Sequence, residues 1–124
     1  MRILPILDSG AERSVIDGTV ALALGWDEAQ IAASPVARPI AGIGSGTGHL
    51  VGYEHRVVCA MSFGPTYAEI ELLVFFTPPN TVTTPVLGRR DFFEQVDFAM
   101  LQAERTCLLR FRDRSALRPR FVAD

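Results

Sequence analysis

The sequence lacks lysine entirely, because all 12 basic residues of the 124-residue chain are arginine. A chain without lysine has no Walker A loop, whose lysine contacts nucleotide phosphates, and no amine side chain for Schiff-base chemistry. Cysteine is also scarce, and Cys59 and Cys107 do not indicate a disulfide framework in a chain of this size. These absences exclude P-loop nucleotide hydrolases and pyridoxal phosphate enzymes.

Long apolar runs are missing as well. The apolar start, Ile3–Leu7, is too short for the core of a signal peptide and is followed at once by Asp8. The longest runs elsewhere, Leu72–Phe76 among them, are far too short to cross a membrane. We therefore expect a cytoplasmic protein with no membrane partner.

The chain has the length of one domain, and a hydrophobic content of 48% argues against disorder. Its net charge of −2 predicts no nucleic-acid partner for the chain as a whole. The charge is uneven, because residues 105–124 hold six arginines and only two aspartates. This end is either a solvated segment or a surface for phosphates or an acidic partner. We expect a folded domain over residues 1–112 and an Arg-rich tail over 113–124.

Short strands dominate the predicted secondary structure. Apolar, β-branched and aromatic residues predict strands at 3–7, at 15–16, from 36 onward, and at 50–61, 67–76, 86–88, 96–101 and 106–111. The fold class expected from this pattern is all-β, in the form of a small, partly open barrel or a sandwich.

One or two short helices interrupt the strands. The clearest covers Val20–Leu24, with Asp17 or Thr19 as its N-cap and Gly25 ending it in the left-handed conformation. Residues 27–33 add a further helical turn. A last one covers 91–95, where the first residue, Asp91, is expected to cap the turn.

A glycine-rich segment, Gly42–Gly48, has glycine at alternate positions. It does not match the dinucleotide fingerprint, because Thr47 stands where the third glycine is required. It does not match the lipase motif either, because Ile43 and Thr47 flank Ser45 at the positions that need glycine. Two interpretations remain: a hairpin that closes over an extended peptide, or an ordinary surface loop.

The most informative stretch is Ile6–Ala11, with the sequence Ile-Leu-Asp-Ser-Gly-Ala. Two apolar residues deliver Asp8 to the end of a strand, a hydroxyl residue follows, and Gly10 allows a sharp turn. Such a segment suits an aspartate in an active site, since the small residues leave room for a substrate backbone. It is also compatible with an ordinary Asp-Ser-Gly turn between two strands.

A second segment, Val86-Leu87-Gly88-Arg89, precedes a short predicted helix late in the chain. Together with Ile6–Ala11 it resembles the retropepsin-like aspartic proteases, the family of the retroviral proteases. In that family the glycine-rich segment between the two motifs is the flap, and Pro39–Ile43 is similar to the segment that opens it. The resemblance covers residues 3–111 and implies a small retropepsin-like barrel with a flap hairpin.

The resemblance implies a role for each matching residue. Asp8 matches the catalytic aspartate, Ser9 matches the hydroxyl residue that reaches the partner loop, and Gly10 matches the position whose carbonyl accepts from the substrate. Glu12 stands where an acid pairs with the arginine after the late glycine, so we expect a partly buried Glu12–Arg89 ion pair. The residues implied in substrate binding are Gly10, Ala11, Glu12, Gly42, Ile43, Gly44, Ser45 and Gly46; those implied in structural support are Glu12, Gly88 and Arg89.

The implied reaction is the hydrolysis of peptide bonds by a water that two carboxylates activate. With one Asp-Ser-Gly motif per chain, the second carboxylate belongs to Asp8 of another copy, so the resemblance implies a homodimer, a peptide substrate and no cofactor. The alternative is a catalytically silent retropepsin-like module that dimerises or binds peptides. A third interpretation is an unrelated small β-barrel with a chance Asp-Ser-Gly.

Two further features bear on these expectations. Retroviral members carry a longer segment before the catalytic aspartate, so we expect either a native chain that extends upstream or a domain that lacks its first strand. Without that strand, Ile3–Leu7 is an open edge that invites pairing with another chain. The only metal-ligand candidates close together, His49, His55 and Cys59, match no zinc spacing, and no metal is expected.

Overall fold

The structure is a computed structural model, and it describes residues 3–40, 50–63, 66–82, 84–111 and 121–123. Most of these residues lie in strands, as the all-β prediction requires. The strands form one six-stranded and one three-stranded sheet, and within the described residues these sheets do not close into a barrel. The mostly β character is therefore as predicted, while the finer prediction of a small, partly open barrel stays a prediction.

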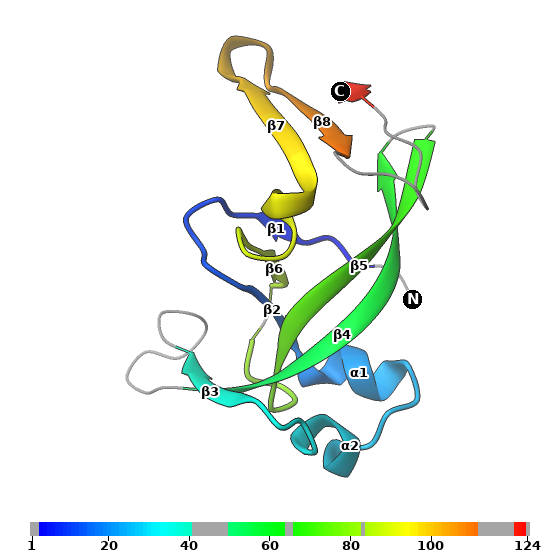
Figure 1. Cartoon of the computed structure of the whole chain (residues 1–124), viewed down its shortest axis with the longest axis vertical. Coiled ribbons are helices and arrows are strands. Elements are labelled where there is room, and N and C mark those ends of the chain that lie inside the picture. The colour runs from blue at the N-terminus through cyan, green and yellow to red at the C-terminus, as the bar shows by residue number, and fades with distance from the viewer. Residues whose placement is uncertain (1–2, 41–49, 64–65, 83, 112–120, 124) are drawn as a thin grey trace.

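The six-stranded sheet has the order β1-β6-β2-β5-β4-β3 (Figure 1). Its members are β1 (Ile6–Leu7), β2 (Ser14–Asp17), β3 (Ala37–Ile40), β4 (Leu50–Phe63), β5 (Thr66–Thr77) and β6 (Val86–Leu87). The late strand β6 lies between two early ones, parallel to β1 and antiparallel to β2. The insertion of β6 between β1 and β2 brings the two motif segments, Ile6–Ala11 and Val86–Arg89, together at one end of the sheet.

The long strands β4 and β5 form a twisted antiparallel pair whose register runs from Tyr53↔Phe76 to Phe63↔Thr66 (Figure 1). On β5, polar Glu69 and Glu71 are exposed while Ile70 and Leu72 are buried, which is the alternation expected of a strand with one solvated face. The structure extends both strands slightly beyond their predicted ends.

Two short helices cover one end of the sheet, beside β2, β4 and β5 (Figure 1). Helix α1 (Gly18–Ala23) begins at Asp17, whose side chain accepts from the backbone N–H of Thr19. Gly25 follows the helix with a φ of 97°, as predicted. Helix α2 (Glu28–Ala32) has a capping box in which Asp27 and Gln30 bond each other's backbone N–H groups.

The second sheet contains β7 (Val96–Leu101), β8 (Thr106–Phe111) and β9 (Phe121–Ala123). The first two coincide with the predicted strands, and the 3-10 turn η2 (Gln102–Glu104) joins them. Strand β9 belongs to the segment expected as an Arg-rich tail and pairs with β8. The 3-10 turn η1 (Phe93–Gln95) precedes β7. The predicted N-cap, Asp91, makes no capping hydrogen bond to η1, and its carboxylate accepts from Ser14 instead.

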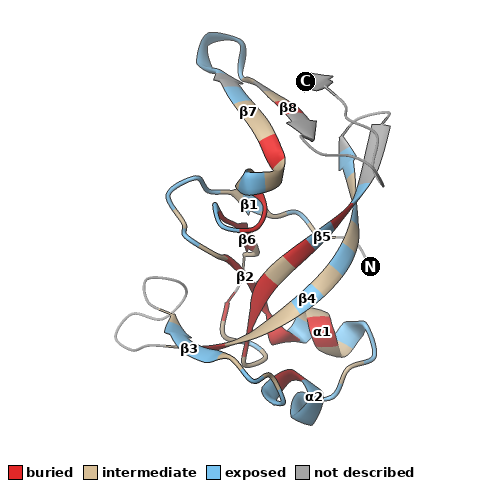
Figure 2. Cartoon of the chain, in the orientation of Figure 1, coloured by how far each residue is buried: buried red, intermediate tan, exposed pale blue. Residues whose placement is uncertain are grey.

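The core lies between the helices, β5 and the segment after β6, and its buried residues are red in Figure 2. Phe76 and Phe92 are the largest of the fully buried side chains. Neither of the two α-helices in the described part has the length and apolarity that a membrane span requires.

Candidate active site

Asp8 lies immediately after β1, at the start of a tight turn. Its backbone N–H donates to the carbonyl of Leu87 at 3.0 Å, so β6 fixes where the turn begins. The N–H of Gly10 donates to Asp8 Oδ1 at 2.9 Å, and the N–H of Ala11 donates to the carbonyl of Asp8 at 3.0 Å. The bond from Gly10 orients the carboxylate and the bond from Ala11 closes the turn, while Asp8 stays exposed.

The turn after Asp8 packs backbone-to-backbone against the loop after β6. The N–H of Arg89 donates to the carbonyl of Ala11 at 2.9 Å, and that of Arg90 donates to the carbonyl of Glu12 at 2.8 Å. Gly88 makes this approach feasible, because a Cβ at that position would lie 2.6 Å from the carbonyl carbon and oxygen of Arg13. The two motifs of the sequence therefore meet in one rigid double loop.

A buried side-chain pair supports the double loop from inside. Ser14 Oγ accepts from the N–H of Gly88 at 3.0 Å and donates to Asp91 Oδ1 at 2.8 Å. Burial raises the pKa of Asp91, against the opposing effect of the bond from Ser14 and the charge of Arg13. Asp91 Oδ2 is buried without a hydrogen-bond partner in the described structure. No local pattern in the sequence predicts this pair, and its one signal is a serine six residues after Asp8.

The predicted Glu12–Arg89 ion pair is wrong. Glu12 instead pairs with the neighbouring Arg90, with 3.1 Å between Arg90 Nη1 and Glu12 Oε1. Both side chains are more than half exposed, so the pair is not partly buried and stabilises the fold by about 1 kcal/mol or less. Arg89 contributes its backbone N–H to the loop contact, while its side chain is exposed.

A cleft of about 520 Å³ opens beside Asp8. One wall is the Asp8 turn and the other is β3, with Val15 and Phe75 from β2 and β5 between them. The lining residues are Asp8, Gly10, Ala11, Glu12, Arg13, Val15, Arg38, Pro39, Ile40, Phe75 and Arg90. The cleft is therefore assembled from segments far apart in the sequence.

Three of the expected substrate-binding residues, Gly10, Ala11 and Glu12, line this cleft. Ser9 is exposed and is not among the lining residues. The expected flap residues Gly42, Ile43, Gly44, Ser45 and Gly46 lie outside the described residues. Strand β3, which leads into that segment, is part of the cleft wall.

The arginines and apolar residues of the cleft were not anticipated. Arg13 is held by an ion pair of 2.6 Å to Glu54 on β4 and stacks over Phe75, with its guanidinium carbon 4.5 Å from the ring centroid. Arg38 and Ile40 come from β3. Proximity among these residues depends on strand pairing, which no local sequence pattern indicates.

The metal-ligand candidates have structural surroundings. His55 bonds the carbonyl of Ile31 at 2.7 Å and lies edge-on to Trp26. Burial raises the pKa of the free thiol Cys59, with a further contribution from the charge of Asp91. His49 lies outside the described residues. Among those described, no three His, Cys, Asp or Glu side chains group as metal ligands do.

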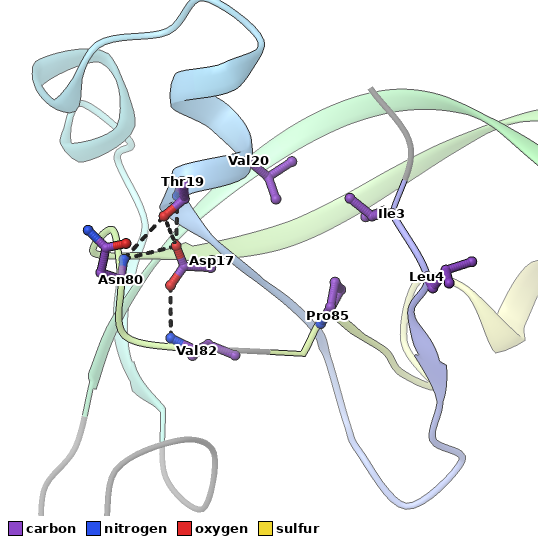
Figure 3. Close-up of a pocket in the computed structure, with 8 residues that line it drawn as sticks. All are labelled: Ile3, Leu4, Asp17, Thr19, Val20, Asn80, Val82 and Pro85. Carbon is purple, nitrogen blue, oxygen red and sulfur yellow. Dashed lines mark hydrogen bonds between the residues drawn. The ribbon is translucent and has the colours of Figure 1, made fainter.

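A second pocket, of about 700 Å³, surrounds Asp17 and shares no lining residue with the Asp8 cleft. Figure 3 shows the Asp17 carboxylate facing the loop after β5, which includes Asn80 and Val82. The backbone N–H groups of these two residues donate to it at 3.0 and 2.8 Å. The carboxylate therefore fastens this loop to the start of α1 and leaves few acceptor positions for a ligand.

Protein-family models, curated proteins and solved structures were each compared with the chain, and none of the three comparisons finds a match. The retropepsin-like resemblance of the two motifs therefore stays a proposal, and its support is the double loop that holds Asp8 at the mouth of the cleft.

Proposed function

We propose that the chain is a retropepsin-like aspartic endopeptidase that works as a homodimer. The observation that carries the proposal is the placement of Asp8. Its carboxylate stands exposed at the end of β1, is oriented by the Gly10 N–H, and borders a cleft of about 520 Å³. Such a carboxylate is positioned to act on a bound substrate rather than to stabilise the fold.

The second carboxylate that the reaction needs comes from another copy of the chain. Within the cleft the acids are Asp8 and Glu12, and Glu12 is engaged by Arg90. A two-fold axis beside Asp8 brings the two Asp8 side chains together. Carboxylates about 3 Å apart share one proton, so one acts as general base on water and the other donates to the carbonyl oxygen of the substrate.

The substrate is an extended peptide segment. Strand β3 is the last strand of the six-stranded sheet, so one of its sides is free of strand partners within that sheet. A peptide in the cleft pairs with this edge as an added strand, which supplies affinity through backbone hydrogen bonds irrespective of sequence. The turn at Gly10 and Ala11 lines the opposite wall.

The second candidate is a silent module that binds peptides or dimerises without cleaving. The free edge of β3 and the cleft serve this function equally well, since neither requires a reactive group. The two candidates differ in what Asp8 contributes: it is indispensable for an endopeptidase and dispensable for a binding module.

Cleavage of a peptide library between pH 3 and pH 7 tests the proposal. We expect cleavage on the acid side, inhibition by a pepstatin-like compound, and a loss of roughly a hundredfold or more in Asp8→Asn. Glu69→Gln is the matched control, because it also removes an exposed carboxylate but lies on β5 and does not line the cleft. Equal cleavage by Asp8→Asn and the unchanged chain overturns the mechanism, and no cleavage by either leaves the silent module.

A further inference from the structure

Arginine side chains dominate the charge of the cleft beside Asp8. Arg13 precedes β2, Arg38 lies on β3 and Arg90 follows β6, so the cations come from three separate segments. Among the described lining residues the acids are Asp8 and Glu12. Three arginines against two acids leave this lining with an excess of positive charge.

The partners of these arginines determine which charge is left for a ligand. Arg90 is neutralised by Glu12 at the rim. Arg13 is paired with Glu54, which stands behind the cleft and is not part of its lining. Arg38 is exposed and makes no ion pair with any described residue. The cation open to a bound molecule is therefore Arg38, on the wall formed by β3.

Arg13 is held in place in the lining of the same cleft. Its side chain is only 17% exposed and is held by Glu54 and by the ring of Phe75. Its Nε is buried and has no hydrogen-bond partner in the described structure. The Nε atom is therefore out of reach of a ligand, and Arg38 remains the exposed cation without an ion pair.

The apolar lining restricts the kind of acid that fits. Val15, Ile40 and Phe75 line the cleft with the arginines, and Ile40 is the one of the three that is not almost fully buried. A side chain with an aliphatic stem and a terminal carboxylate matches this combination, because its stem contacts Ile40 while its oxygens reach the guanidinium of Arg38.

We propose that the Asp8 cleft selects peptides with an acidic side chain, glutamate above all, and that Arg38 is the residue that determines this preference. The inference rests on the proposed function only in taking a peptide as the occupant of the cleft. It assigns a substrate class to a site whose chemistry is set by Asp8.

A binding measurement tests the preference without requiring cleavage. The full chain with Asp8→Asn is titrated at pH 6 into fluorescent peptides that carry one Glu, Gln or Lys at successive positions, and anisotropy is recorded. At this pH the glutamate is ionised. At one position we expect Glu to bind about fivefold more tightly than Gln, with Lys the weakest, and added salt to reduce the difference.

Charge reversal then identifies the residue. In Arg38→Glu we expect the order to invert, with Lys above Gln and Glu. Arg105→Glu is the matched control: it makes the same change in net charge at an exposed residue between β7 and β8, outside the cleft, and is expected to keep the original order. An unchanged order in Arg38→Glu, an inverted one in Arg105→Glu, or no binding of any peptide overturns the inference.

Cleavage of the same peptides by the chain with Asp8 intact separates the two proposals. A preference for glutamate in binding with no cleavage contradicts the endopeptidase and leaves the inference intact. Cleavage that is equally fast for Glu, Gln and Lys at every position contradicts the inference and leaves the endopeptidase intact.

Discussion

The buried carboxylate of Asp17 accepts hydrogen bonds from several backbone N–H groups. Burial raises its pKa, but the hydrogen bond from the side chain of Thr19 and those from the backbone of Val82, Thr19 and Thr81 outweigh burial and lower the pKa from 3.8 to about 2. A lowered pKa means that the ionised form stabilises the fold. This contribution is complete above pH 4 and is lost as the pH falls toward 2.

Replacing Asp17 tests directly whether its ionised carboxylate stabilises the fold. We expect Asp17→Asn to reduce the free energy of unfolding at pH 7 by about 2 kcal/mol, and the gap to the unchanged chain to narrow between pH 4 and pH 2. Urea unfolding at several pH values measures both. Asp27→Asn, at the exposed N-cap of α2, is the control and is expected to cost about 1 kcal/mol or less. A deficit of the same size at every pH contradicts the account.

Asp91 has the opposite dependence on pH. Because burial raises its pKa, its contribution to stability is present below pH 3.8 and is lost as the pH rises through its folded pKa.

The sequence indicated Asp91 as a helix cap and missed its bond to Ser14, since a local pattern shows only the neighbours along the chain. The choice of Arg89 as the partner of Glu12 came from the family resemblance, which matches positions along the chain. Adjacent side chains point in different directions, and in the fold Arg90 reaches the acid.

Among the elements, the contact between the Asp8 turn and the loop after β6 leaves no room for a side chain at Gly88. At Gly88 a methyl group would meet the carbonyl of Arg13 at 2.6 Å and the carbonyl oxygen of Ala11 at 2.9 Å. These are backbone atoms in a hydrogen-bonded loop, so they have little freedom to move. The double loop and the orientation of Asp8 therefore depend on the absence of a side chain at this position.

We expect Gly88→Ala to lower the free energy of unfolding by about 2–3 kcal/mol and to abolish cleavage. Gly25→Ala is the comparison, because its cost arises from the positive φ of 97° in open space and amounts to about 1 kcal/mol. Chemical denaturation and peptide cleavage of the two variants measure the difference. Retention of full stability in Gly88→Ala refutes the close approach, and loss of cleavage in Gly25→Ala refutes the assignment of activity to the Asp8 loop.

How well an element is predicted from the sequence depends on whether its signal is local or comes from contacts distant in the chain. Strands β7 and β8 and helix α1 were predicted well, because alternation, capping and a left-handed glycine are local. The insertion of β6 between β1 and β2 was not predicted, since strand order depends on contacts distant in sequence. The residues that complete the cleft, such as Arg38 and Phe75, were missed for the same reason.

At the scale of the whole molecule, the proposed activity requires two copies of the chain. The edge strand β1 ends at Asp8, and the exposed side chains of Leu4 and Ile6 lie just before it. Apolar side chains beside the two-fold axis are the kind of surface that a second copy covers. The expected barrel, by contrast, is not formed by the described strands, because the three-stranded sheet does not pair with the six-stranded one.

The most direct test of a shared active site is the cleavage rate when chains with and without Asp8 are mixed. A fixed amount of the unchanged chain is incubated with increasing Asp8→Asn until subunits have exchanged, and cleavage of one peptide is followed. We expect the rate to fall toward zero at large excess of the variant, because each mixed dimer contains only one Asp8. A rate that stays constant as Asp8→Asn is added would contradict a site built from two copies.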